Sequence, residues 1–147
     1  MSTSPAPDPP PAAVGARRRS RERALGLLYE AEAKAITPAE LLKELPVAPE
    51  HFAAALVSGV SGRLPEIDGL ISRFARDWGL DRLPAVDRQL LRLSIYELLD
   101  QAEVPVAVVI DEAVELAKQY STEESSRFVN GVLSAVASEV RPTKAAS

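Results

Sequence analysis

Apolar residues recur at three- and four-residue steps along most of the chain, and this periodicity constrains the fold more than any other feature. In the last such segment, at about 122–140, the residues on this spacing are Phe128, Val129, Val132, Leu133, Val136 and Val140. Comparable segments lie at about 24–35, 38–45, 49–62, 64–78, 85–101 and 105–120. Several begin at a proline, which the first turn of a helix tolerates. The pattern predicts an all-α fold of about seven helices.

Two short stretches have some strand character but fit helices better. The run VAVVI at 106–110 would suit a buried strand, but the sequence offers no second strand to pair with it. Asn130-Gly131 is a hairpin signal only between alternating apolar residues, and its flanks follow helical spacing instead. Since a glycine inside a helix costs about 1 kcal/mol relative to alanine, we expect a close helix crossing at Gly131.

The two ends of the chain differ in composition from the helical part. Residues 1–15 hold five of the twelve prolines and a single charge, so they predict a disordered, proline-rich arm. Residues 142–147 form a short tail, and residues 16–141 form the helical domain. A chain of 147 residues fits one domain of this kind better than two.

Few residues are suited to catalysis or metal binding. The chain has no cysteine and a single histidine, His51, which excludes thiolate sites and disfavours a histidine-based metal site. Asp111 and Glu115 are four residues apart and could share a cation or a proton, but an ordinary charged helix face explains them more simply. No glycine-rich phosphate loop is present. We therefore expect no enzymatic activity, no metal and no cofactor.

The sequence also gives no sign of a membrane or export segment. No apolar run approaches the roughly 18 residues that cross a bilayer. The arginines before ALGLLY have some likeness to an export signal, but Glu30 and Glu32 interrupt the apolar stretch. We expect a cytoplasmic protein.

The strongest functional signal is the segment RRRSRER at residues 17–23. Its five arginines and Glu22 give it a charge of +4, whereas the whole chain carries −4, so the rest of the chain carries −8. Cations near a helix N-terminus oppose the helix macrodipole, each by roughly 0.3–1 kcal/mol. The arginines also spread around much of the helix circumference instead of forming one stripe. We expect this turn to project from the domain and to meet an anion.

Nucleic acid is the anion that fits best. A membrane surface would need large apolar residues among the basic ones, and Leu25 and Leu27 belong to the core face. An acidic protein is an alternative, but arginine forks grip phosphates and stack on bases, whereas lysine supplies charge alone. Tyr29 could add a stacking face. The acidic remainder could bind a second, basic partner, which would make the protein an adaptor.

Four separated motifs resemble the bacterial transcription antitermination factor NusB. They are RRRSRERALGLLYE, VDRQLLRLSIYELL, VPVAVVIDEAVELAK and SSRFVNGVLSAV, which follow the family's order over about residues 17–140. The resemblance implies two packed helical subdomains without catalytic activity. It also implies binding to the boxA element of ribosomal RNA leader transcripts, together with the small-subunit ribosomal protein that acts as NusE. Family members act with NusA, NusG and RNA polymerase.

The resemblance assigns roles to particular residues. It implies that the RNA is contacted by Arg17, Arg18, Arg19, Arg21, Arg127 and Phe128. The surface for the ribosomal protein is implied to include Tyr29, Asp87 and Glu124. Two positions depart mildly from the family pattern, since Asp111 stands where asparagine is common and Glu124 where aspartate is common.

Other functions remain compatible with the same residues. One alternative is a helical adaptor that binds protein and acts in ribosome maturation without contacting RNA directly. Another is a homodimer that buries the arginine surface. The same fold also occurs as an RNA-binding module of ribosomal RNA methyltransferases, but no cofactor-binding domain follows in this sequence, so we do not expect that activity.

Overall fold

Each predicted helical segment forms a helix in the computed structural model, which describes residues 11–75 and 79–142. The all-α prediction is confirmed, and the run VAVVI begins a helix. The elements in chain order are α1 (Pro11–Ala33), α2 (Pro38–Glu44), α3 (His51–Gly62), α4 (Leu64–Phe74), the short 3₁₀ helix η1 (Leu80–Arg82), α5 (Ala85–Asp100), α6 (Val106–Tyr120) and α7 (Glu123–Val140).

Local capping explains where two of these helices begin. Before α2, the Thr37 hydroxyl accepts a hydrogen bond from the Glu40 backbone N–H at 3.1 Å. The Glu40 carboxylate in turn accepts one from the Thr37 N–H at 3.0 Å, which completes a capping box. Before α7, the Thr122 hydroxyl accepts from the Ser125 N–H at 2.9 Å. These interactions satisfy backbone donors that have no partner within the helix.

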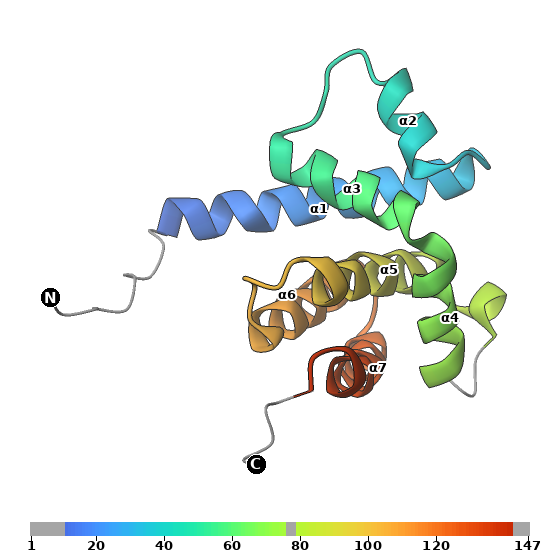
Figure 1. Ribbon diagram of the computed structural model, residues 1–147, viewed down its shortest axis with the longest axis vertical. Helices are drawn as coiled ribbons and strands as arrows, with labels where there is room; N and C mark the ends of the chain where they lie inside the picture. Colours follow the sequence, from blue (N-terminus) through green and yellow to red (C-terminus); the bar gives the residue numbers. More distant parts are fainter. Residues whose placement is uncertain (1–10, 76–78, 143–147) are drawn as a thin grey trace, which may run out of the picture.

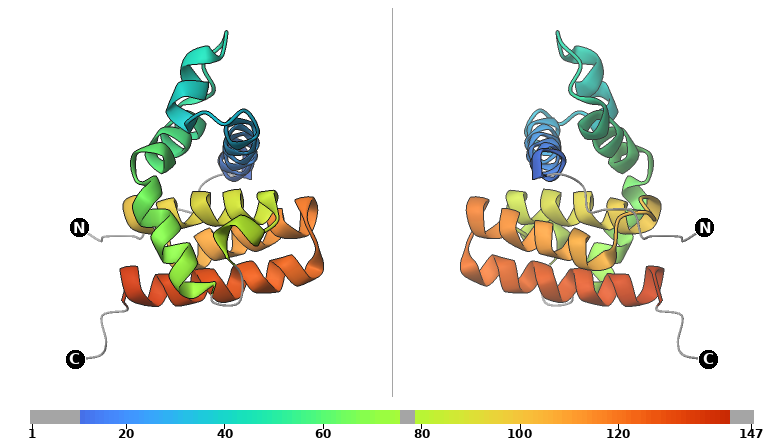
Figure 2. Two further views of the ribbon diagram at one scale, coloured as in Figure 1. Left: turned by 90° about the vertical axis from the view of Figure 1, so that its right-hand side faces the viewer. Right: turned by 90° about the vertical axis from the view of Figure 1, so that its left-hand side faces the viewer.

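The helices form two groups that pack on each other through α5. Helices α1, α2 and α3 make up one group and α4 to α7 the other, in agreement with the two helical subdomains expected (Figures 1 and 2). Helix α5 contacts α1 and α3 on one side and α4, α6 and α7 on the other. Its side chains are buried around most of the helix, and they join one continuous core with Leu27 and Leu28 of α1.

Helix α1 begins earlier than the sequence predicted. Residues 11–15 of the expected disordered arm are helical, while residues 1–10 of that arm and residues 143–147 of the tail lie outside the described residues. Pro11 occupies the first helical position, where its missing N–H costs nothing. The arginines therefore lie beyond the first turn, and the predicted macrodipole penalty does not apply to them. Helix α4 ends at Phe74, before the end predicted at about residue 78, and Trp78 lies outside the described residues.

The predicted close helix crossing at Gly131 is wrong, and the helical glycine that is tightly packed is Gly59. Gly131 is exposed on α7, and a Cβ atom there would meet nothing within 4 Å among the described residues. A Cβ atom on Gly59 of α3 would lie 2.0 Å from Cζ of Tyr96. The Tyr96 ring of α5 therefore fills the space that a side chain at residue 59 would need.

The C-terminal end of α5 is held by a side chain from the end of α7. The Arg141 guanidinium donates hydrogen bonds to the backbone carbonyls of Glu97, Leu98 and Gln101 at 2.7–2.8 Å, and also to that of Val104. The last carbonyls of a helix have no partner within the helix. Arg141 supplies that partner and fixes the turn between α5 and α6.

Candidate nucleic-acid and protein interface

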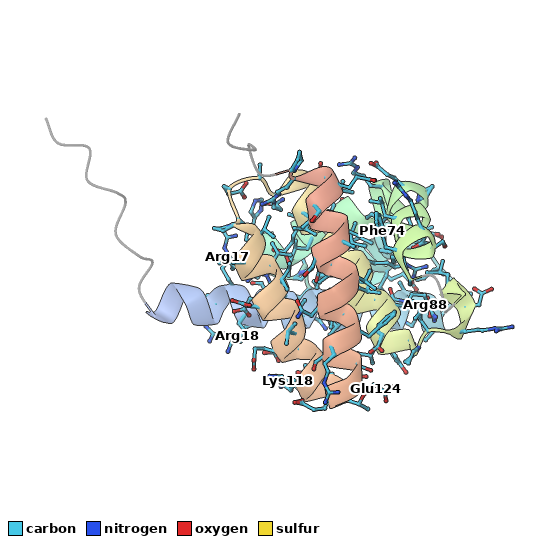
Figure 3. The ribbon with its side chains drawn as sticks, turned by 90° about the horizontal axis from the view of Figure 1, so that it is seen from below. Arg17, Arg18, Phe74, Arg88, Lys118 and Glu124 are labelled. Carbon is cyan, nitrogen blue, oxygen red and sulfur yellow. The ribbon has the colours of Figure 1, made fainter. Side chains whose placement is uncertain are left out.

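The arginine segment lies where α1 first meets α3, α5 and α6, next to the end of α1 that extends past them (Figures 1 and 3), so it does not project from the domain as expected. Residues 17–23 cover almost two turns, so their side chains leave the helix in different directions. Two arginines turn toward carboxylates of the domain, one lies on an aromatic ring, and two face outward.

Arg18 and Arg21 are paired with the protein's own acidic residues. The Arg18 guanidinium donates hydrogen bonds to both carboxylate oxygens of Glu112 on α6, at 2.8 and 3.0 Å. This hydrogen bonding lowers the pKa of Glu112. Arg21 binds Glu97 of α5 at 2.9 Å, and both side chains are at most 5% exposed. Two of the anions that these arginines meet are therefore carboxylates of the same domain. The sequence suggested that Arg21 is exposed, but the structure buries it.

Arg17 lies on the ring of Phe52, the second residue of α3. Its Cζ is 4.0 Å from the ring centroid, and Cζ of Arg21 is 5.6 Å from the same centroid. Phe52 is partly buried, while Arg17 is exposed. A guanidinium 4 Å above an aromatic ring gains a cation–π interaction. The stack joins the arginine segment to the N-terminus of α3.

Glu50 fixes the start of α3 next to α1. Its carboxylate accepts hydrogen bonds from the Ser20 hydroxyl of α1 and from the backbone N–H groups of Phe52 and Ala53, both at 2.9 Å. The Ser20 hydroxyl and then the two N–H groups hold the pKa of Glu50 at about 2. The same carboxylate thus caps α3 and clamps it to the turn of α1 that carries the arginines.

Arg19 and Arg23 are four residues apart, so they share one face of α1, and both are exposed. Within residues 11–75 and 79–142, no ion pair involves Arg17, Arg19 or Arg23. The exposed positive charge of the segment is therefore concentrated on these three side chains, with Arg18 shared between Glu112 and solvent at 47% side-chain exposure.

Three of the other expected site residues meet at one pocket. Asp87 of α5 and Glu124 and Phe128 of α7 line a pocket of about 440 Å³, whose remaining walls are Leu83, Pro84, Ser121, Thr122 and Ser125. Figure 3 shows Glu124 at the end of α7 where the chain enters from α6. Phe128 is partly buried and Arg127 is exposed. Among the described contacts, no hydrogen bond, ion pair or ring contact joins either of them to the arginines of α1.

Asp87 is buried at this pocket with an incomplete set of hydrogen bonds. Its residue exposure is 2%, and Oδ2 accepts a hydrogen bond from the Ser125 hydroxyl at 2.8 Å. Oδ1 has no hydrogen-bond partner among the described residues. A buried carboxylate oxygen without a partner carries a desolvation penalty. A donor from a bound partner would remove that penalty.

Tyr29 lines a second, neighbouring pocket of about 330 Å³. The other walls come from Glu22, Leu25, Gly26, Val86 and Tyr120. Tyr29 and Tyr120 are 48% and 45% exposed, which is unusual for large rings. The Tyr120 hydroxyl donates a hydrogen bond to Glu22 at 2.7 Å, and this bond raises the pKa of the hydroxyl. Val86 is adjacent in sequence to Asp87, so the two pockets flank the first turn of α5.

Comparison with known sequences decides the family. The sequence profile that describes the NusB family matches residues 18–138. The chain belongs to the NusB family. A relative from Salinispora tropica named transcription antitermination protein NusB is 48% identical over 130 residues, which cover 83% of this chain and 95% of the relative. The name of this relative agrees with the expectation of a non-enzymatic protein.

Solved structures of NusB proteins share the fold. The T. maritima NusB structure matches with a TM-score of 0.77 and 39% identity over 86% of this chain and 93% of that one. A crystal structure of the antitermination factors NusB and NusE in complex with double-stranded RNA matches with a TM-score of 0.72 and 31% identity. That match covers 84% of this chain and 96% of the other.

Some residues of this NusB-family site could not be recognised from the sequence. Phe52, Glu97 and Glu112 contact the arginines from positions 35 to 94 residues away along the chain. Tyr120 is the last residue of α6, and only its aromatic character could have indicated that it belongs to the site. The overall acidity of the chain is a weaker sign of a basic partner than the sequence suggested. Four of the acidic residues form ion pairs with arginines of the same domain, namely Glu32, Asp68, Glu97 and Glu112.

Two other kinds of site are absent from the described residues. They contain no cluster of three histidine, aspartate or glutamate side chains that could hold a metal ion. None of the described helices is long and apolar enough to cross a membrane.

Proposed function

We propose that this protein is a transcription antitermination factor that binds boxA RNA of ribosomal RNA leader transcripts. In this proposal it binds the RNA together with the ribosomal protein NusE and acts with NusA, NusG and RNA polymerase in the cytoplasm. The observation that carries the proposal is the set of exposed arginines on α1 that no carboxylate of the described residues neutralises. The similarity to a NusB relative solved with NusE and double-stranded RNA supports it.

The exposed arginines are suited to the sugar-phosphate backbone. Arg17, Arg19 and the half-exposed Arg18 lie close together near the N-terminal end of α1. Arginine forks bind phosphate oxygens in a bidentate manner. Arg127, exposed on α7, would extend the contact, and Phe128 beside it would offer an aromatic surface. Arg21 is left out of this role because Glu97 holds it in the interior.

The two pockets beside the first turn of α5 are suited to a basic protein. Tyr29 and Tyr120 provide exposed aromatic area, which is common at energetically important interface positions. Asp87 and Glu124 provide negative charge at the adjacent pocket. Oδ1 of Asp87 would accept a hydrogen bond from an inserted lysine, arginine or backbone N–H. No arginine lines either pocket, so the exposed arginines of α1 would stay available to RNA while a protein occupies the pockets, and Phe128 would lie beside both partners.

A titration of a labelled boxA RNA tests the RNA part of the proposal. The triple variant Arg17→Ala/Arg18→Ala/Arg19→Ala should bind more weakly than wild type. Its plot of log affinity against log salt should be less steep by roughly 2, since each phosphate contact to single-stranded RNA contributes about 0.7. The matched control is Lys34→Ala/Lys43→Ala/Arg73→Ala, which removes three exposed basic residues elsewhere and should leave the slope unchanged. Equal slopes for the two variants would refute the proposal.

A protein-binding adaptor or homodimer without RNA is the second candidate function. The pairing of Arg18 and Arg21 with internal carboxylates favours it, because it gives those arginines a structural role. In this case the protein would act in ribosome maturation through its tyrosine-lined pocket. Size-exclusion chromatography with the ribosomal protein, with and without boxA RNA, separates the two functions. Complex formation that is unaffected by RNA, with no RNA in the complex, supports the adaptor.

A further inference from the structure

We infer that Phe52 and Arg17 form a stacking platform on which an unpaired RNA base is held. The inference rests on the proposed RNA binding and extends it from phosphate contacts to a base contact. It starts from the 4.0 Å separation between Cζ of Arg17 and the centroid of the Phe52 ring. The guanidinium lies over the ring and Arg17 is exposed, and we infer that its side away from the ring is open to a ligand.

Three contacts fix the position of Phe52 beneath Arg17. Phe52 lies in the first turn of α3, where the Glu50 carboxylate accepts a hydrogen bond from its backbone N–H. The Ser20 hydroxyl links Glu50 back to α1, one turn from Arg17. Arg21 lies 5.6 Å from the ring centroid and is itself fixed by Glu97. The platform is therefore organised before any ligand binds, which lowers the entropic cost of binding.

The side chain of Arg17 differs from those of Arg18 and Arg21 because its N–H groups have no partner among the described residues. Arg18 and Arg21 direct their N–H groups to carboxylates, whereas no hydrogen bond or ion pair of Arg17 is found among the described residues. Its charge and its planar face are both available. Unpaired bases stack on guanidinium planes, and every base has a suitable face. A column of ring, guanidinium and base follows from this arrangement.

The domain contains a matched pair in which the arginine is occupied. On α4, Cζ of Arg73 lies 5.0 Å from the ring centroid of Phe74, but Arg73 also forms an ion pair with Glu139 at 2.6 Å. This pair has the same residue types and similar exposure without a free guanidinium. Figure 3 shows that Phe74 and Arg17 lie in different parts of the molecule. Substitutions there control for general effects of losing an arginine or a ring.

The experiment uses the full chain and a single-stranded boxA RNA in which 2-aminopurine replaces one base at a time. Arg17→Lys keeps the charge but removes the plane, so affinity should fall by about tenfold while the salt slope stays that of wild type. Phe52→Leu should also weaken binding with an unchanged slope, and Phe52→Tyr should restore it. One 2-aminopurine position should be quenched by wild type and not by Arg17→Lys. Arg73→Lys and Phe74→Leu should match wild type in all three measurements.

The possible outcomes separate this inference from the function on which it rests. If wild type binds the RNA but Arg17→Lys and Phe52→Leu bind equally well, Arg17 contacts phosphate only and the platform is refuted while the proposed function stands. If wild type fails to bind the RNA, both are refuted. Urea unfolding of Phe52→Leu is measured in parallel, and Arg17→Lys, which leaves the core untouched, decides the case if Phe52→Leu is unstable.

Discussion

Nη2 of Arg21 lies 2.9 Å from Oε1 of Glu97, and this ion pair is buried between α1 and α5. The Arg21 Nε also donates to both Glu97 oxygens, at 3.0 and 3.1 Å. The pair connects the two groups of helices at a position where the family resemblance implied an RNA contact. Arg21 thus serves the fold, while Arg17, Arg19 and Arg23 form no ion pair among the described residues and remain available to a ligand.

The pair predicts a strong asymmetry between single and double substitutions. Arg21→Met or Glu97→Leu alone leaves a buried charge without its partner, which typically costs about 3–5 kcal/mol. The double variant Arg21→Met/Glu97→Leu replaces the pair by apolar groups and should recover most of that loss. Urea unfolding followed by circular dichroism gives the four free energies of a double-mutant cycle. Additive losses would contradict the prediction.

Most helices could be predicted because their signals are local. The apolar periodicity and the prolines at the starts of α2 and α6 act over a few residues, and both signals hold in the structure. The start of α1 could not be placed, because a proline-rich segment is compatible with both an extended arm and a first helical turn. The helical outcome at Pro11 moved the arginines away from the helix end.

The candidate site could be predicted only in part, because its geometry depends on contacts between distant segments. Exposed arginines at Arg17 and Arg19 followed from composition and resemblance. The carboxylates that bind Arg18 and Arg21 come from 94 and 76 residues further along the chain, and no local pattern indicates them. Phe52 looked like a core residue, since apolar spacing cannot show that an arginine covers its ring.

Removal of Glu112 should strengthen RNA binding. The Glu112 carboxylate occupies the Arg18 guanidinium, so an RNA phosphate must compete with it. Glu112→Gln keeps the shape and frees the arginine, so affinity for boxA RNA should rise severalfold, while the salt slope stays that of wild type because Arg18 contacts one phosphate in both proteins. Glu115→Gln, exposed on the same helix, changes the net charge equally and should have a smaller effect. Identical behaviour of the two variants would exclude competition by Glu112.

Glu50 predicts an acid-sensitive junction between α1 and α3. The Ser20 hydroxyl and two backbone N–H groups hold the pKa of Glu50 at about 2, whereas an unfolded glutamate has a pKa of about 4.3. As the pH falls below about 4.3, the unfolded chain takes up a proton first, so the stability contributed by Glu50 is full above this pH and is lost as the pH approaches 2. The difference in unfolding free energy between wild type and Glu50→Gln should therefore shrink over this range. A difference that is constant with pH would contradict the assignment.

Asp87 should control binding of the basic protein partner without affecting RNA. Asp87→Asn keeps the size of the side chain but removes the charge whose Oδ1 has no partner among the described residues. Loss of one member of a buried charged contact typically costs about 2–5 kcal/mol, so affinity for the ribosomal protein should fall by at least about tenfold. Calorimetry with the purified partner measures this, and Asp111→Asn on the exposed face of α6 serves as the control. An equal loss in both variants would point to net charge alone.

Two glycines in helices should respond oppositely to the same substitution. In Gly131→Ala the new methyl group meets nothing within 4 Å among the described residues, so the higher helix propensity of alanine should stabilise the protein by about 1 kcal/mol. In Gly59→Ala the methyl group would lie 2.0 Å from Cζ of Tyr96, so the Tyr96 ring or α3 must shift, at a cost of about 1–3 kcal/mol. Combining Gly59→Ala with Tyr96→Leu removes the ring from the contact and should recover part of the loss. Thermal and urea unfolding of wild type and the three variants compare them directly. If Gly131→Ala were destabilising, the packing that the sequence suggested at Gly131 would have to be restored, because no other property of an exposed helical glycine favours it over alanine.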